Sequence, residues 1–127
     1  MKLKNILIVV EDIEKSKAFY KDLFGLEVIT DLEGNVILTE GLVLQEKKIW
    51  ENLIDKTVTG KGHDVELYFE EAQLDSFLKK LETSGYDIEY VHPSIEHGWG
   101  QRVLRIYDPD GHVIEVREPM EKRKEQM

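Results

Sequence analysis

The chain carries two copies of one pattern, strand–helix–strand–strand–strand, and this internal repeat restricts its fold more than any other feature. In each copy a glycine ends a predicted helix and a strand follows, as in Gly25–Ile29 and, 60 residues later, Gly85–Glu89. A second landmark, Gly41–Gln45, recurs 70 residues later as Gly111–Glu115. A repeat of this length indicates two modules built on the same plan. The larger second offset places an extra loop in the second module.

We therefore predict a single domain over residues 1–127, with one module at about 2–46 and the other at about 63–118. A linker helix is expected over about 47–60, and a charged tail over 119–127. A chain of 127 residues buries about two-thirds of its unfolded surface, so it needs neither a metal nor a disulfide to fold.

Apolar side chains at helical spacing predict one amphipathic helix in each module. Their core-facing residues are expected to be Ser16, Phe19, Tyr20 and Leu23 in the first and Leu74, Phe77, Leu78 and Leu81 in the second. Asp12 is a good N-cap for the first helix, and Gly25 ends it. The predicted strands cover 2–10, 26–30, 36–39, 42–45, 64–69, 86–91, 101–107 and 113–117. Asp108–Gly111 predicts a tight turn before the last strand, with His112 solvated.

The formal net charge of −9 disfavours two classes of partner, nucleic acids and anionic membranes, because both are bound through Lys and Arg. The absence of cysteine excludes disulfides, thiolate metal sites and cysteine nucleophiles. The apolar runs are far shorter than the ~20 residues that span a bilayer. Because the first residues enter a strand-like run rather than a signal-peptide pattern, we expect a cytoplasmic protein.

Three segments carry a resemblance to a known family: Ile8–Tyr20, Leu23–Leu26 and Tyr107–Val116. Together with the repeat, they resemble the vicinal oxygen chelate superfamily, which includes glyoxalase I, bleomycin-resistance proteins, fosfomycin-resistance enzymes and extradiol dioxygenases. The resemblance implies an α+β fold in which two tandem βαβββ modules form an open, cup-shaped mixed sheet with helices on the outside. It further implies a small-molecule site inside the cup and a homodimer.

The resemblance also implies where a metal would bind, since metal enzymes of this family take one ligand, commonly His or Glu, from each of four strands. The matching positions here are Asn5, Gln45, Asp64 and Glu115. Glu115 fits the pattern, whereas the two amides are weak ligands and neither usual histidine is present. We therefore expect no cofactor, with a divalent metal (Mg, Mn, Ni or Zn) as the alternative. A bulge at His63 would turn its imidazole inward and restore one ligand.

Strand alternation places three carboxylates, Asp64, Glu66 and Glu115, on the predicted inner face. Three readings remain open. They could hold a hard cation. Without a metal, they could bind a cationic ligand, or raise one another's pKa so that Glu66 or Glu115 acts as a general base. Alternatively, Glu66 is solvated and Arg105 or Arg117 neutralises Glu115.

Further candidates for the site are aromatic and basic side chains. The loop 92–100 is expected to be a lid, in which His97 is a candidate acid or base and Trp99 a candidate stacking platform; a packing role is the alternative. Trp50 on the linker helix either contacts the ligand or packs in the core or an interface. Arg105 is expected to hold an anionic substrate, with Tyr68 beside it.

Two functions follow from these patterns. The first is a glyoxalase-like small-molecule-binding protein that acts as a lactoylglutathione-lyase-type lyase or isomerase beside a carbonyl. The second is a non-catalytic, metal-free protein that sequesters a drug or other ligand, as bleomycin-resistance proteins do. The altered ligand set and the acidic charge favour the second, and the resemblance itself favours the first.

Overall fold

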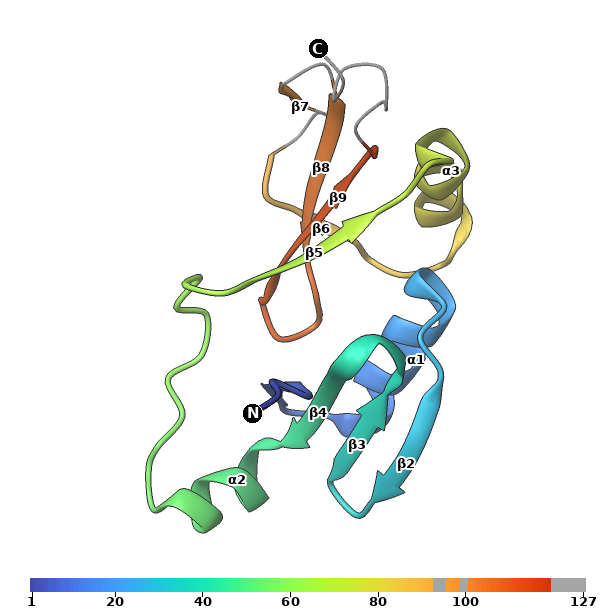
Figure 1. The fold of residues 1–127 in the computed structure, drawn as a ribbon. Helices are drawn as coiled ribbons and strands as arrows, with labels where there is room; N and C mark the ends of the chain where they lie inside the picture. Colours follow the sequence, from blue (N-terminus) through green and yellow to red (C-terminus); the bar gives the residue numbers. More distant parts are fainter. Residues whose placement is uncertain (93–95, 99–100, 120–127) are drawn as a thin grey trace. The chain divides into compact units, whose positions relative to one another are not determined.

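A computed structural model describes residues 1–92, 96–98 and 101–119, with the backbone alone for 96–98. The chain forms two compact units, Met1–Gly60 and Lys61–Met127 (Figure 1). Each unit contains one copy of the repeat and has its own mixed sheet. The predicted α+β class with two βαβββ modules is confirmed.

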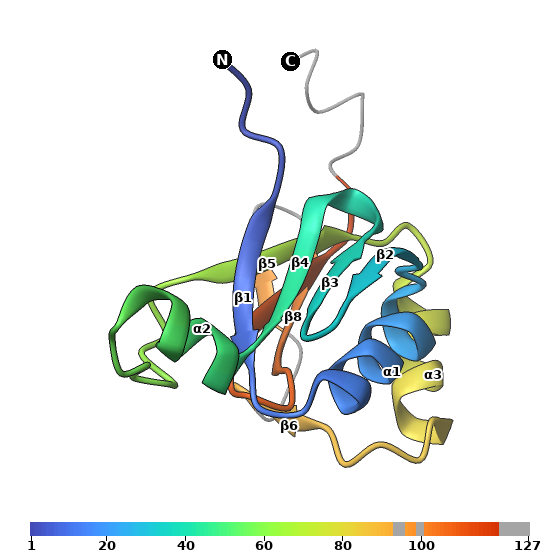
Figure 2. The same cartoon turned by 90° about the horizontal axis from the view of Figure 1, so that it is seen from below.

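The first unit contains a four-stranded sheet in the order β1-β4-β3-β2. Along the chain its elements are β1 (Ile6–Val10), α1 (Ile13–Phe24), β2 (Val28–Leu32), β3 (Asn35–Leu38), a 3₁₀ turn (Thr39–Gly41), β4 (Leu42–Glu46) and α2 (Lys47–Ile54). β1 runs parallel to β4, and the other pairs are antiparallel. Figure 2 shows these strands side by side with α1 along the sheet.

The second unit repeats this topology, with the sheet order β5-β9-β8-β6. Its elements are β5 (Glu66–Glu70), α3 (Leu74–Thr83), β6 (Glu89–Tyr90), β7 (Glu96–Gly98), β8 (Gln101–Tyr107) and β9 (Val113–Arg117). β5 is parallel to β9, and β9 is antiparallel to β8. β6 and β7 are both antiparallel to β8.

The two helices bury the faces that their spacing predicts, except that Leu78 of α3 is half-buried. Phe19, Tyr20 and Leu23 of α1 are at most 3% exposed, and Leu74 and Leu81 of α3 are at most 2% exposed. The Asp12 carboxylate accepts a hydrogen bond from the Lys15 amide at 3.1 Å and caps α1. Local sequence therefore defines both helices.

The turn between β8 and β9 also follows its sequence. The Gly111 N–H donates to the Asp108 carbonyl at 3.0 Å, which closes a four-residue turn. Gly111 has a φ of +86°, a conformation that strains other residues, and a Cβ there would collide with the Lys61 side chain.

Several element boundaries differ from the prediction. α2 ends at Ile54 instead of near residue 60, because Asp55 takes a left-handed conformation and its N–H bonds to the Glu51 carbonyl. β5 begins at Glu66 instead of Asp64, after Lys61 and His63 with positive φ. No helix in the described part of the chain has the length and apolar character needed to cross a membrane.

The largest difference concerns the predicted strand 86–91 and the predicted lid 92–100. The strand contains two residues, Glu89 and Tyr90, and the loop contributes β7. β6 pairs with one end of β8, at Ile106 and Tyr107, and β7 pairs with the other end, at residues 101–103. The seven-residue β8 thus pairs with two short strands, and the pairing of Gly98 with Gln101 places this glycine in a strand instead of a loop.

Candidate functional site

The candidate site lies on one face of the second unit's sheet, where three predicted side chains form a row. Tyr68 pairs with Glu115 across β5 and β9, and Glu115 pairs with Arg105 across β9 and β8. Because side chains alternate along a strand, Glu66 and Arg117 share this face. The sequence prediction placed Glu66, Tyr68, Arg105 and Glu115 together, and within the second unit the register does so.

Glu115 is at the centre of an ion-pair cluster that we call the Glu115 cluster: Glu66, Arg105, Glu115 and Arg117. Oε1 of Glu115 accepts from Arg105 Nη2 at 2.8 Å, and Oε2 accepts from Arg117 Nε at 2.8 Å. Arg105 Nε also donates to Glu66 Oε1, at a longer 3.4 Å. Each oxygen of the central carboxylate therefore bonds a different guanidinium.

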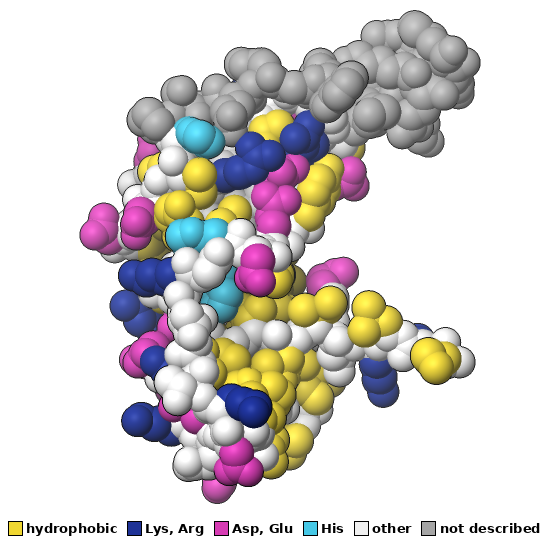
Figure 3. All heavy atoms as spheres, turned by 90° about the vertical axis from the view of Figure 1, so that its left-hand side faces the viewer, with side chains coloured by type: hydrophobic (Ala, Val, Ile, Leu, Met, Phe, Trp, Pro, Cys, Tyr) yellow, Lys and Arg dark blue, Asp and Glu magenta, His cyan; other side chains and the backbone are white. Residues whose placement is uncertain are grey.

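Exposure increases outward from this centre. The Glu115 side chain is 4% exposed, Arg117 16%, Arg105 28% and Glu66 38%. A buried carboxylate is costly unless charged partners satisfy it, and the two guanidiniums supply short, charge-assisted hydrogen bonds. In Figure 3 basic and acidic side chains lie directly beside one another in this part of the molecule.

Two further groups extend the face. Arg117 Nη1 donates to the side-chain oxygen of Gln101 at 3.3 Å, and the Gln101 amide donates to the Glu118 carbonyl. Tyr68 is 52% exposed. Partial burial raises the pKa of the Tyr68 phenol, and the charge of Glu70 adds to the rise, so the ring carries a neutral hydroxyl at pH 7.

The Glu115 cluster contains two of the three carboxylates that the sequence predicts on the inner face, Glu66 and Glu115. The structure pairs Glu115 with both arginines named in the sequence reading as its neutralisers, and it pairs Glu66 with Arg105. Asp64 lies before β5 and is exposed. Within the second unit the face thus carries alternating charges instead of three unpaired carboxylates.

The first unit holds the other two predicted ligands. Gln45 on β4 is 4% exposed, and its Oε1 accepts from Asn35 Nδ2 at 2.7 Å. Its Nε2 donates to the Glu46 carbonyl at 3.2 Å. Asn5 precedes β1 and is half-buried.

The four predicted ligands do not fit a resident metal. Two are neutral amides, and the oxygen of Gln45 is already the acceptor of a short hydrogen bond. Both oxygens of Glu115 accept from guanidiniums, whose positive charge opposes a cation at that carboxylate. His63 has a φ of +60°, and its ring lies against Tyr107, with centroids 5.5 Å apart.

A different group among the described residues has the composition of a metal site: Asp108, Asp110 and His112, whose ligand atoms lie within 4.8 Å of one another. However, the Asp108 carboxylate already accepts from the Asp110 and His112 amides, both at 2.9 Å. His112 Nδ1 lies 2.7 Å from the second oxygen of Asp108. These bonds organise the β8–β9 turn, so the group has a structural role in the hairpin.

The prediction that His112 is solvated is wrong, because its side chain is 25% exposed and bonds to Asp108. Burial by itself lowers the pKa of His112, but the hydrogen bond to Asp108 and the charges of Asp108 and Asp110 outweigh it, so the pKa is raised. The sequence contained the signal, since an aspartate four residues before a histidine across a tight turn lies within reach.

The remaining predicted site residues are placed as follows. Trp50 lies on α2 and is half-buried. His97 lies in β7, paired through its backbone with Arg102. Trp99 and the side chain of His97 lie outside the described residues, as does the predicted tail from residue 120 onward.

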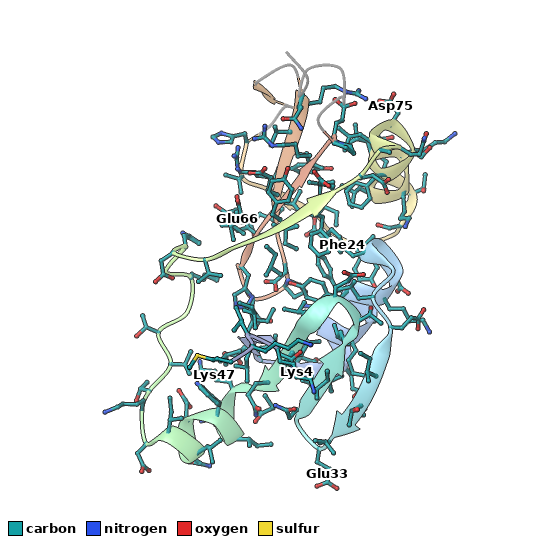
Figure 4. All side chains as sticks on the ribbon, viewed as in Figure 1. Lys4, Phe24, Glu33, Lys47, Glu66 and Asp75 are labelled. Atoms are coloured by element: carbon teal, nitrogen blue, oxygen red, sulfur yellow. The ribbon has the colours of Figure 1, made fainter. Side chains whose placement is uncertain are left out.

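β8 carries a second arginine, Arg102, which forms ion pairs separate from the Glu115 cluster. Arg102 donates to Asp75 Oδ1 at 2.8 Å and to Glu118 Oε2 at 2.9 Å. Its guanidinium lowers the pKa of both carboxyls. Figure 4 labels Asp75, on α3, and Glu66, at the start of β5. We call this the Arg102 cluster; its carboxylates are the helix residue Asp75 and the strand-end residue Glu118.

Comparison with known proteins agrees with the fold and the repeat. The model of the glyoxalase-like domain matches residues 3–121. The chain belongs to the glyoxalase-like domain family. The predicted likeness to the glyoxalase, bleomycin-resistance and dioxygenase group is confirmed.

Two solved structures are similar over most of their length. A protein of unknown function from Agrobacterium tumefaciens is 34% identical with a TM-score of 0.80, over 94% of this chain and 95% of that one. A lactoylglutathione lyase from Agrobacterium tumefaciens is 25% identical with a TM-score of 0.70, over 92% of each chain.

A curated relative is the manganese-dependent 2,3-dihydroxybiphenyl 1,2-dioxygenase from Geobacillus genomosp. 3, which is 25% identical over 127 residues. The match includes 97% of this chain and 38% of the relative. The chain thus spans well under half the length of that enzyme.

Proposed function

We propose that this glyoxalase-like protein binds a small molecule on the charged face of its second-unit sheet, without a resident metal. The observation that carries the proposal is the engagement of both Glu115 oxygens by Arg105 and Arg117. A carboxylate that neutralises two guanidiniums is a poor metal ligand, because binding a cation would require it to give up a charge-assisted bond.

Binding would use the groups that are partly exposed on this face. The Arg105 guanidinium supplies directional donors, and the Tyr68 ring offers an apolar surface with a hydroxyl at its end. Glu115 and Arg117 lie deeper and fix the position of Arg105. The face therefore offers a preorganised polar surface, which favours sequestration of a ligand over its chemical conversion.

The second candidate function is a metal-dependent enzyme, a lyase of the lactoylglutathione type or a dioxygenase. The observations in its favour are the relatives named for those activities. In that case Glu115 would leave the arginines to bind the metal, with Asn5, Gln45 and Asp64 as further ligands. Glu66 and His97 would be the acid–base groups.

Metal analysis separates the two candidates. The purified chain is dialysed against Mn²⁺, Ni²⁺ or Zn²⁺, bound metal is counted by mass spectrometry, and turnover of the methylglyoxal–glutathione adduct is assayed. We expect substoichiometric metal and no turnover. Stoichiometric metal that is lost in Glu115→Ala and kept in Glu82→Ala, which removes an exposed glutamate of α3, would overturn the proposal.

The homodimer and the role of Trp50 also remain proposals. Light scattering coupled to size-exclusion chromatography measures the mass in solution. We expect twice the 14.8 kDa of one chain, and a mass of one chain would contradict the dimer.

A further inference from the structure

We propose that Glu115 is a positioning residue that holds Arg105 and Arg117 side by side as one binding site for the oxyanion of a small organic ligand. The ligand oxyanion replaces Glu66 at Arg105. This inference rests on the proposed function and deepens it by naming the ligand class, an anion of the carboxylate or phosphonate type, and by adding Arg117 to the site.

Glu115 sets the spacing of the Arg105 and Arg117 guanidiniums. Two like charges on neighbouring strands repel each other unless an anion lies between them. Glu115 bonds each arginine through a separate oxygen, both at 2.8 Å, so one buried carboxylate sets their separation. A guanidinium has five N–H donors in one plane, so an arginine that bonds Glu115 through one nitrogen can bond a planar oxyanion through another.

Glu66 is the member of the cluster that a ligand can replace most readily. Its bond to Arg105 is 3.4 Å, against 2.8 Å for the two bonds to Glu115, and its side chain is the most exposed of the cluster. Within the Glu115 cluster, the bond from Arg105 to Glu66 is therefore the weakest, and Glu66 is the side chain nearest to water. A ligand oxyanion with better geometry takes its place, and the total charge at Arg105 is then unchanged.

The two carboxylates of the cluster determine the sign of the ligand charge. The cluster contains two arginines and two glutamates, but the two carboxylates are not equivalent. Glu115 is buried and held by two bonds, so an incoming cation cannot recruit it without stranding both arginines. Displacement of Glu66 removes one negative charge from beside Arg105, and a ligand anion restores it.

Tyr68 indicates the shape of the ligand next to its oxyanion. Tyr68 is the neighbour of Glu115 in register on β5, and it is 52% exposed. A ring or flat apolar group attached to the oxyanion would pack on this side chain. The site thus fits a compact molecule with an oxyanion at one end and a planar group next to it.

Phenylphosphonate is a probe of this class, and benzyl alcohol is its uncharged control. In ¹⁵N-labelled protein, the Nε–H signals of the arginines report binding at each guanidinium. We expect phenylphosphonate to shift the signals of Arg105 and Arg117 and to leave that of Arg102 in place. Benzyl alcohol should shift none of them. Binding that leaves the signals of Arg105 and Arg117 unmoved would overturn the proposal.

Two charge-equivalent substitutions separate positioning from simple electrostatics. Glu66→Gln and Glu115→Gln each remove one negative charge from the cluster, so charge alone predicts tighter phenylphosphonate binding in both. Positioning predicts opposite signs. Glu66→Gln should tighten binding about threefold, and Glu115→Gln should weaken it about tenfold, because the arginines lose their shared acceptor. Tighter binding by Glu115→Gln would overturn the positioning role.

Further variants keep the test decisive if Glu115→Gln does not fold. Arg117→Lys keeps the charge and loses the planar donor set, so we expect binding weakened about fivefold or more. Arg102→Lys makes the same change in the Arg102 cluster and should leave binding within about twofold of the unsubstituted protein. Equal effects of the two substitutions would contradict the assignment of Arg117.

The two proposals fail in different ways. Stoichiometric metal or turnover of the adduct would refute metal-free binding whatever phenylphosphonate does. A metal-free protein that binds phenylphosphonate more tightly after Glu115→Gln would preserve the proposed function and refute the paired-arginine site.

Discussion

Equivalent rows of the two sheets carry different chemistry. In the first unit Val9, Gln45 and Asn35 pair across β1, β4 and β3, and in the second Tyr68, Glu115 and Arg105 pair across β5, β9 and β8. Gln45 is 4% exposed and Glu115 3%, and each is the acceptor of a short hydrogen bond from the neighbouring strand.

This difference shows what the fold requires at that position. Both rows need a buried hydrogen bond, and a neutral amide pair satisfies the first. Because the same topology forms without charge, the ions of the second row are not a requirement of the fold. This is the physical ground for placing the ligand on the second sheet.

The strongest way to break the comparison is Glu115→Ala. It leaves two guanidiniums with no shared counter-ion, and we expect the free energy of unfolding to fall by roughly 2–4 kcal/mol, less than for a fully buried pair because both arginines reach water. Urea denaturation followed by circular dichroism at pH 7 measures the loss. A smaller loss than in Gln45→Ala, the equivalent variant of the first unit, would show that the charges are solvated and contribute little to stability.

The equivalent substitution in the first row is Gln45→Ala. The amide of Asn35 then loses its acceptor in a half-buried place, and we expect a loss of about 1–3 kcal/mol in the same urea titration. In the Gln45→Ala background, Asn35→Ala should cost less than it does alone, because the two side chains share one bond. Additive losses would contradict the pairing.

The smallest expected effect concerns two equivalent positions of the repeat, Leu42, which begins β4, and His112, which directly precedes β9. A raised pKa means that folding favours protonated His112, whose bond to Asp108 stabilises the hairpin fully below pH 6.5, its ordinary pKa. This contribution is lost as the pH rises through the raised pKa.

The test compares unfolding free energies at acidic and alkaline pH. We expect the difference between pH 6 and pH 8.5 to shrink in His112→Leu, which copies the first-unit residue. The charge of Asp110 also raises the pKa of His112, so Asp110→Asn is the control for the neighbouring charge. An unchanged pH dependence in His112→Leu would contradict the role of the imidazole.

Much of the candidate site could be predicted from strand alternation. The positions of Arg105 and Glu115 on one face follow from the period of two in β8 and β9, whose bounds the sequence predicts correctly. The same argument places Arg117, two residues after Glu115, on this face, where the sequence prediction names it as a possible neutraliser of Glu115. The position of Asp64 was harder to predict from the sequence, because His63 has a positive φ and β5 begins only at Glu66.

Local physics accounts for what the sequence by itself determined: the repeat, the two helix faces, the cap at Asp12 and the turn at Asp108–Gly111. Each of these depends on residues within a few positions of one another. The tertiary structure decided that Glu115 bonds Arg105 and Arg117 at the same time, that Arg105 also bonds Glu66, and that Gln45 accepts from Asn35. Apart from the contact between Glu115 and Arg117 within β9, these bonds join different strands, and they form only when strand register brings the side chains together.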